Sequence, residues 1–152
     1  MKKLILFALV SSVIISCRKD DDDEKSESLI VGTWTLTKNQ VMSGKDNSVL
    51  FSEAITDCPD KRTYLFSENN YTINSFKDNF TGSCIIDDTE NGEFNYDGNQ
   101  KQITFKSTRT NNPYTLKVNS VTNHELQLID PLYYYDVDND GISDKYVMVF
   151  NK

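Results

Sequence analysis

The sequence predicts an all-β fold, a small antiparallel up-and-down β-barrel of about eight strands. Short segments rich in Thr, Val, Ile, Tyr and Phe alternate apolar with polar residues, as half-buried strands do. Polar turns containing Gly, Asn and Asp separate these segments at short intervals. From residue 17 onwards, no stretch of ten or more residues has apolar residues at helical spacing. Sequential strands joined by tight turns favour an up-and-down barrel over a Greek key.

The expected strands follow one another from residue 29 to the end of the chain, as one domain. The run Val49–Phe51, within 48–56, fits either a strand or a single helical turn. The apolar residues expected to share a face within successive strands are Ile30, Trp34 and Leu36; Tyr64 and Phe66; Tyr71 and Ile73; Phe94 and Tyr96; Ile103 and Phe105; Tyr114, Leu116 and Val118; Leu126 and Leu128; and Tyr146, Met148 and Phe150.

Residues 1–16 have the pattern of an export signal. Two lysines precede a mostly apolar stretch, 4–15, and Ser16 is a small residue at the expected cleavage site. The stretch is shorter than the about 20 apolar residues that a transmembrane helix needs. The run from residue 14 to Cys17 resembles a bacterial lipobox, which implies that Cys17 is acylated and anchors the protein to a membrane. A signal peptide with an incidental cysteine is the alternative.

The segment 17–28 is expected to be an acidic tether that lifts the domain off the membrane. It is polar and free of aromatic residues, as solvated linkers are. Arg18 and Lys19 followed by the acidic run 20–24 resemble the surface-export signal of Bacteroidetes lipoproteins. The resemblance implies a lipid-anchored protein of the outer membrane, displayed at the cell surface; the periplasmic face is the alternative.

The charge of the chain argues against a nucleic-acid partner. The 152 residues include 16 basic and 23 acidic ones, a net charge of −7. Without Lys2 and Lys3 of the signal, 14 basic residues remain against 23 acidic ones, a net charge of −9. Nucleic-acid binding needs a basic surface, and binding of anionic lipid by charge needs one as well. The membrane contact is therefore assigned to the lipid on Cys17.

Cys58 and Cys84 are the two remaining cysteines of the expected exported domain. An even pair in an oxidising compartment indicates a disulfide. Two free thiols or a pair of metal ligands are the alternatives, although no further cysteine or histidine accompanies them.

The stretch from residue 29 to 36 resembles the first strand of lipocalin-like proteins, in which a Gly-x-Trp motif places the tryptophan across the closed end of the barrel. Here the motif is Gly32-x-Trp34. The most similar group is the lipocalin-like domain lipoproteins of Bacteroidetes, in which a lipobox and an acidic tether precede this motif. A cysteine pair, a Gly-led strand such as 92–94 and a Leu-x-Leu strand such as 126–128 complete the resemblance over residues 29–152.

The resemblance implies a cup that holds a small apolar or amphipathic molecule. The candidate lining residues are Tyr64, Phe66, Ile103, Phe105, Tyr114 and Leu116. The competing hypothesis is a barrel filled by its own side chains, which would act as a structural or interaction subunit and contact another protein of the cell envelope or a glycan through its loops. A ligand pocket exceeding about 300 Å³ would distinguish the two.

An Asp-rich loop near the C-terminus is the sharpest chemical motif. Aspartates at the first, third and fifth places and glycine at the sixth match the start of an oxygen-rich calcium loop. Val147 stands at the twelfth place, where an EF-hand has glutamate, so a weak, structural Ca²⁺ site is expected; a plain hairpin turn is the alternative. The candidate ligands are Asp136, Asp138, Asp140, the carbonyl of Ile142, and Asp144.

The sequence offers no catalytic motif, so no enzyme is predicted. His124 is the single histidine, which is too few nitrogen ligands for a zinc site. A nucleophile elbow, a zinc-protease motif and a phosphate-binding glycine loop are all missing from the sequence.

Overall fold

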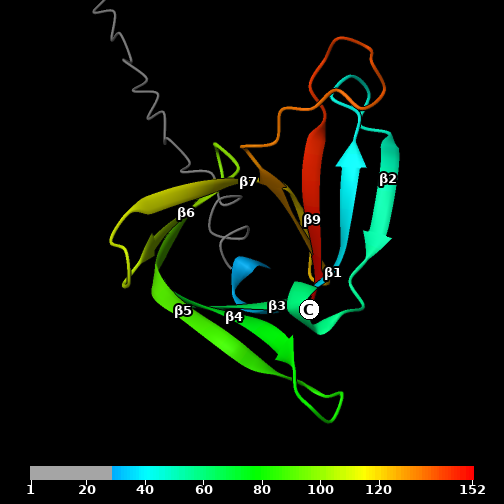
Figure 1. Ribbon diagram of the computed structural model, residues 1–152. Helices are drawn as coiled ribbons and strands as arrows, with labels where there is room; N and C mark the ends of the chain where they lie inside the picture. The colour runs from blue at the N-terminus through cyan, green and yellow to red at the C-terminus, as the bar shows by residue number, and fades with distance from the viewer. Residues whose placement is uncertain (1–28) are drawn as a thin grey trace, which may run out of the picture.

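A computed structural model describes residues 29–152, which form a single antiparallel sheet curved into a ring (Figure 1). The expectations for residues 1–28, including Cys17, lie outside the described residues. The strands are β1 (Gly32–Met42), β2 (Val49–Ala54), β3 (Arg62–Ser67), β4 (Asn70–Asp78), β5 (Cys84–Asp97), β6 (Gln102–Ser107), β7 (Pro113–Val121), β8 (Glu125–Asp130) and β9 (Lys145–Asn151), with a short 3₁₀ helix η1 (Cys58–Asp60). Within this part of the chain, no helix is long and apolar enough to cross a membrane.

Strand β1 closes the barrel because it pairs along both of its edges. One edge pairs with β9 from Thr35 to Met42. The other edge pairs first with β3, from Gly32 to Thr35, and then with β2, from Lys38 to Met42. The all-β, antiparallel prediction is confirmed, and from β3 to β9 each strand lies beside its successor.

Strand β2 makes the observed number of strands nine instead of about eight. The ambiguous stretch 48–56 is this strand, and β1 is the one strand that it pairs with among the described residues. Because it lies at an edge, it has no buried residue; Val49 and Phe51 are about half exposed.

The core lies inside the ring, where alternate residues of the strands meet. Its largest fully buried side chains include Trp34, Phe66, Tyr71, Phe105 and Phe150. The strand-by-strand prediction of inward residues is therefore largely correct.

Trp34 anchors the start of the chain to the barrel. Its indole N–H donates a 2.7 Å hydrogen bond to the carbonyl of Ile30, which is itself fully buried. On the other side, the ammonium of Lys152 lies 4.8 Å from the ring centroid, a cation–π contact. The Gly-x-Trp motif therefore ties both ends of the described chain together.

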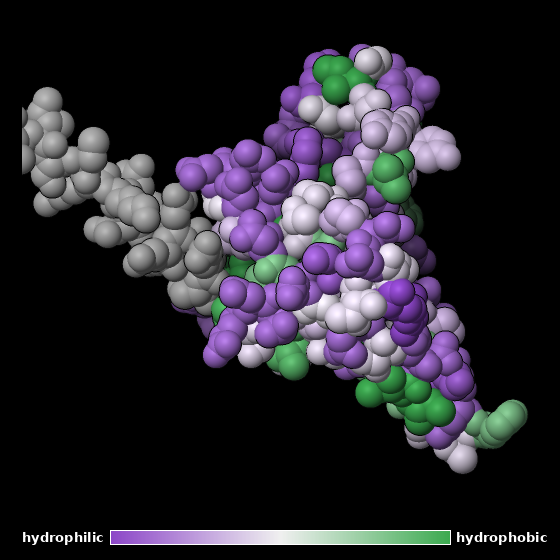
Figure 2. Space-filling view, turned by 90° about the vertical axis from the view of Figure 1, so that its left-hand side faces the viewer, coloured by the Kyte–Doolittle hydropathy of each residue, from purple (hydrophilic) through white to green (hydrophobic). Residues whose placement is uncertain are grey.

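Strands β4 and β5 extend beyond their neighbours as a projecting hairpin. β3 pairs with β4 no further than Ser75, and β6 pairs with β5 no earlier than Gly92. The hairpin is the lowest part of the molecule in Figures 1 and 2, and Figure 2 shows apolar surface there. Exposed apolar side chains on it are Phe80, Ile85 and Ile86.

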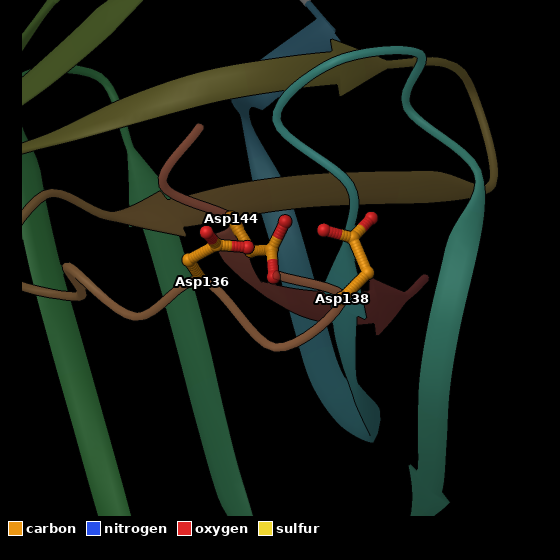
Figure 3. A group of neighbouring side chains, drawn as sticks. All are labelled: Asp136, Asp138 and Asp144. Carbon is orange, nitrogen blue, oxygen red and sulfur yellow. The ribbon is translucent and has the colours of Figure 1, made fainter. Parts of the chain in front are cut away.

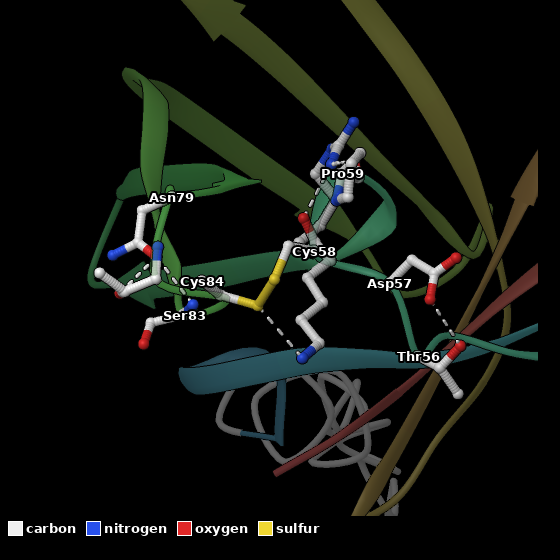
Figure 4. The surroundings of a disulfide bond; sticks show 10 residues. Thr56, Asp57, Cys58, Pro59, Asn79, Ser83 and Cys84 are labelled. Carbon is white, nitrogen blue, oxygen red and sulfur yellow. Dashed lines mark hydrogen bonds between the residues drawn. A yellow bond between two sulfur atoms is a disulfide. The ribbon is translucent and has the colours of Figure 1, made fainter.

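The predicted disulfide between Cys58 and Cys84 is confirmed, with Cα atoms 5.4 Å apart (Figure 4). It joins η1 to the first residue of β5, at the base of the hairpin turn. In that turn, the Asn79 side chain accepts hydrogen bonds from the N–H groups of Thr81 and Ser83. An isolated hairpin is marginally stable, so these links hold it in place.

Candidate functional site

The six residues predicted to line a cup lie on β3, β6 and β7. Five of them are buried and belong to one core cluster. The sixth, Tyr114, is 38% exposed although its ring stacks on Phe105, with centroids 4.9 Å apart and planes 11° apart. Tyr114 therefore lies where the aromatic core meets solvent.

The aromatic rings of this group pack against one another. The centroid of the Phe105 ring lies 6.3 Å from that of Tyr64 and 6.0 Å from that of Phe66. The ring of Phe150 on β9, which β1 separates from β3, has its centroid 4.8 Å from that of Tyr64. These contacts fill the middle of the barrel at the level of Phe105, so a ligand would have to bind beyond them, on the side of Tyr114.

A carboxylate faces the inside of the barrel next to these rings. The register places Glu90 of β5 opposite Ile73 of β4, which in turn lies opposite Tyr64 of β3. Ile73 packs against the core, so Glu90 shares the inner face. The phenol of Tyr71 donates a hydrogen bond to the Glu90 carboxylate.

Gly92 makes this hydrogen bond possible. A Cβ atom at Gly92 would lie 2.7 Å from the ring of Tyr71 and 2.2 Å from the carbonyl oxygen of Lys106. The ring of Tyr71 lies close to β5 at this glycine, and its hydroxyl reaches Glu90, two residues before Gly92. Close packing of Tyr71 and Lys106 therefore explains why glycine occupies position 92 in the predicted Gly-led strand.

Burial raises the pKa values of the three tyrosines around Glu90. The pKa of Tyr64 rises to about 12, first because the phenol is buried and also because Glu90 is negative nearby. Burial also raises the pKa of Tyr71, and its hydrogen bond to Glu90 adds to the effect. The pKa of Tyr114 is raised by burial and by the neighbouring Tyr64 and Glu90. All three phenols are neutral hydrogen-bonding groups at physiological pH.

Glu90 escaped the sequence-based prediction because only apolar residues were assigned to the barrel interior. The available signal was its place in the alternation: Glu90 precedes Gly92, Phe94 and Tyr96 at intervals of two. An acidic residue in the register of an inward-facing series is a candidate for recognition of a ligand.

The opposite wall carries further acidic residues. The register aligns Glu53 of β2 with Asn39, and Asn39 with the core-packed Met148. Asp130, at the end of β8, lies opposite Tyr146. Burial raises the pKa of the Tyr146 phenol, and the negative charges of Glu53 and Asp130 add to this.

Two small pockets lie along β5 and β6. One, of about 250 Å³, is lined by Glu93, Phe94, Asn95, Thr104, Lys106 and Pro113. The other, of about 160 Å³, is lined by Glu93, Lys106, Ser107, Thr108 and Asn111. Both fall below the about 300 Å³ that is typical of small-molecule sites.

The Asp-rich loop brings three of its four aspartates together (Figure 3). One carboxylate oxygen from each of Asp136, Asp138 and Asp144 lies within 4.8 Å of the others. The Asp140 carboxylate is not in this group and accepts a 2.8 Å hydrogen bond from the Ile142 N–H instead. The Ile142 side chain is 46% exposed.

Backbone N–H groups of the loop bind the clustered carboxylates. Asp136 accepts hydrogen bonds from the N–H groups of Asp140 and Gly141, and these bonds lower the pKa of Asp136. Desolvation raises the pKa of Asp138, and the negative charges of Asp140 and Asp144 reinforce the rise. Backbone hydrogen bonds favour the charged form of Asp136, whereas burial and neighbouring negative charges disfavour that of Asp138.

The buried Asp144 ties the loop to the β1–β2 connection. Its two carboxylate oxygens accept hydrogen bonds from the N–H groups of Gly44 (3.1 Å) and Val137 (2.6 Å). A Cβ atom at Gly44 would lie 2.1 Å from the carbonyl oxygen of Ser143, so the two loops are in close contact. Asp144 thus has a structural role whether or not a cation binds.

The closed, single-sheet barrel with an aromatic interior places this protein in the class of small β-barrel proteins typified by lipocalins. A family profile described as a lipocalin-like domain matches residues 30–128. The chain belongs to this family of lipocalin-like domains. A comparison with curated proteins finds no match.

Solved structures with similar folds include bacterial and animal proteins. A lipocalin-like protein from Bacteroides uniformis is 17% identical, with a TM-score of 0.48, covering 82% of this chain and 98% of that one. Lobster apocrustacyanin A1 and the apocrustacyanin C2 structure are each 13% identical, with TM-scores of 0.44. Each of these two alignments covers 86% of this chain and 64% of the other protein.

Proposed function

We propose that this protein is a lipid-anchored protein of the outer membrane, displayed at the cell surface, whose barrel binds a small apolar or amphipathic ligand. Proteins of lipocalin-like families are generally binding proteins and not enzymes. The observation that carries the proposal is Tyr114, an inner-wall ring that stacks on the core and is 38% exposed. Apolar surface at the edge of a packed aromatic wall is suited to an apolar group.

The anchoring part of the proposal rests on the sequence. The lipobox-like run ending at Cys17 and the acidic tether after it support a lipid anchor and export to the surface. The periplasmic face of the outer membrane remains the alternative location.

Native mass spectrometry tests the ligand. The full-length chain is purified from the producing cells and released from detergent micelles in the gas phase, before and after chelation of metal ions. We expect an added mass of several hundred daltons, beyond the lipid anchor, that survives chelation and is lost on unfolding. A mass equal to that of the acylated chain alone would contradict a carried ligand.

A second candidate function is that of a structural or interaction subunit of a cell-envelope complex. The ring contacts at the level of Phe105 favour it, because they fill the middle of the barrel. The projecting hairpin favours it as well, because Phe80 stands fully exposed on a turn that the disulfide and Asn79 hold in place. Crosslinking from the hairpin on intact cells would distinguish this function, since it predicts a specific adduct there.

We further propose that Asp136, Asp138 and Asp144 bind Ca²⁺ with the weak affinity of extracellular modules, about 10⁻⁴–10⁻³ M. The support is the approach of their oxygens to within 4.8 Å, a spacing at which a cation offsets the repulsion. The ion would hold the loop before β9 and would not take part in chemistry. The carboxylate of Asp140 points to a different partner and is not needed for this set of ligands.

Thermal unfolding with added calcium tests this site. Millimolar Ca²⁺ should raise the melting temperature of the parent, and Asp138→Ala should remove the rise. Asp78→Ala, an exposed acidic residue on the β4–β5 hairpin, is the matched control and should keep it. An equal calcium response in the Asp138→Ala variant would leave the plain turn as the explanation of the motif.

A further inference from the structure

No ion pair within residues 29–152 includes the interior-facing carboxylate of Glu90, although the positive charge of Arg109 lies close enough to attract it. Ion pairs in residues 29–152 join Lys77 to Asp87 and Arg109 to Asp88. The guanidinium of Arg109, the nearest candidate, is held by two 2.8 Å hydrogen bonds to Asp88 and one of 2.9 Å to the Thr89 carbonyl. The Glu90 carboxylate accepts a hydrogen bond from the neutral phenol of Tyr71.

Aromatic side chains surround this carboxylate on the same inner face. Tyr64 lies two strands away in the same cross-strand row, and Tyr71 lies on the adjacent strand. Tyr114, which stacks on Phe105, extends the group toward solvent. Glu90 is only partly buried and Tyr114 is 38% exposed, so both side chains are accessible from solvent.

A negative charge next to several phenol rings is the arrangement that recognises an organic cation. The faces of tyrosine rings attract an ammonium group, and desolvation strengthens that attraction. A carboxylate at the same place adds a charge-assisted contact. An anionic head group, such as that of a fatty acid, would be repelled by Glu90 and would leave it without compensation.

The opposite wall has the same sign of charge. Glu53 and Asp130 share the inner face with Met148 and Tyr146, as the pairing of β2, β1, β9 and β8 shows. Arg62, which lies near Tyr64, opposes this bias, but its guanidinium is held by hydrogen bonds to the carbonyls of Pro59 and Lys61. The acidic residues of both walls therefore favour a cation over an anion within the barrel.

We propose that the ligand of this barrel is an amphiphile with a cationic, amine-type head group, and that Glu90 and Tyr114 bind this head. The inference rests on the proposed ligand-binding function and specifies the chemical class of the ligand. Tyr71 acts as a positioning residue, because its hydroxyl fixes the Glu90 carboxylate.

Three water-soluble probes with the same six-carbon chain test the proposal: hexyltrimethylammonium, hexanoate and hexanol. Their binding to the full-length chain in lipid nanodiscs is measured by titration calorimetry, with empty nanodiscs as the blank. We expect hexyltrimethylammonium to bind at least tenfold more tightly than either of the others. This comparison in the parent protein needs no variant and is independent of any folding defect.

Glu90→Gln is the matched variant, because glutamine keeps an oxygen that accepts the Tyr71 hydrogen bond. This variant should bind hexyltrimethylammonium at least tenfold more weakly than the parent does, and its affinity for hexanol should be unchanged. Glu93→Gln removes a charge from the exposed, opposite face of the same strand, and it should change the affinity for neither hexyltrimethylammonium nor hexanol.

The possible failures have different meanings. Equal affinity for all three probes, or tightest binding of hexanoate, would overturn the cationic head group and leave the proposed binding function standing. An unchanged affinity of the Glu90→Gln variant for hexyltrimethylammonium would overturn the role of Glu90. If none of the three probes binds, the inference and the proposed ligand-binding function fail together.

Discussion

Gly92 controls how closely Tyr71 approaches β5, and through Tyr71 it controls the environment of Glu90. The space that a Cβ atom would need is occupied by the backbone oxygen of Lys106, which cannot move without disturbing β6. A single missing side chain therefore connects the packing of the barrel wall to the chemistry of the proposed site.

We expect Gly92→Ala to destabilise the protein by about 1–3 kcal/mol, the usual cost of overpacking a filled core. The clash with Lys106 and the displacement of the Tyr71 ring are the physical reasons. Urea unfolding followed by fluorescence measures the change. Asn95→Ala, at an exposed position on the same strand, is the control and should stay within about 0.5 kcal/mol of the parent. Equal stability of Gly92→Ala and the parent would contradict this account.

Individual inward residues could be predicted where the alternation of apolar residues is regular. Trp34, Phe66, Ile103 and Leu128 are buried as the pattern indicates. Tyr114 has the same pattern but lies at the start of its strand, where solvent replaces the next layer of the core. Position along a strand is set by how the sheet closes, which local alternation does not encode.

At the scale of elements, the edge strand and the projecting hairpin are the features that the alternating pattern describes least well. Both faces of β2 are largely exposed, so selection for one apolar face is weak and the sequence lacks a clear period. The β4–β5 hairpin exposes Phe80, Ile85 and Ile86 for a related reason, because no neighbouring strand covers its outer half. The pairing of β2 with β1 and the length of the hairpin therefore had to come from the structure.

The disulfide links the turn end of this hairpin to the segment between β2 and β3. Cys58 and Cys84 are 26 residues apart in sequence, and closing a loop of that size stabilises the fold by about 3.5 kcal/mol by loop-closure entropy. We expect the double variant Cys58→Ser, Cys84→Ser to lose stability of that order in urea unfolding. Reductant should lower the unfolding midpoint of the parent and leave that of the double variant unchanged. A parent midpoint that does not respond to reductant would show that the bond contributes nothing to stability.

At the scale of the whole molecule, the charge and the family membership point to the same kind of protein. The net charge of −7 disfavours nucleic acids and anionic lipid surfaces, and a lipocalin-like barrel is a scaffold for binding. A fold of this kind does not specify its ligand, since function depends on the groups placed inside it. The inward carboxylates and tyrosines are the groups in which this chain carries its own specificity. The alternation of apolar residues predicted the tyrosines, but it missed the carboxylates because they interrupt an otherwise apolar face.

The proposed anchor determines where such specificity would be used, and it is tested on whole cells. Acylation of Cys17 would place the barrel at a membrane by lipid alone, because about 0.8 kcal/mol per buried CH₂ outweighs the unfavourable acidic charge. We expect Cys17→Ser to move the protein from the membrane fraction to the soluble fraction of cells that process lipoproteins.

Replacing the acidic run 20–24 by asparagine and glutamine provides the matched control for the anchor, since the cysteine is kept. This variant should stay in the membrane fraction but become resistant to protease added to intact cells, because the tether and not the lipid is proposed to direct surface display. Continued membrane association of the Cys17→Ser variant would contradict the lipid anchor. Protease sensitivity that does not change in the tether variant would place the surface signal elsewhere in the chain.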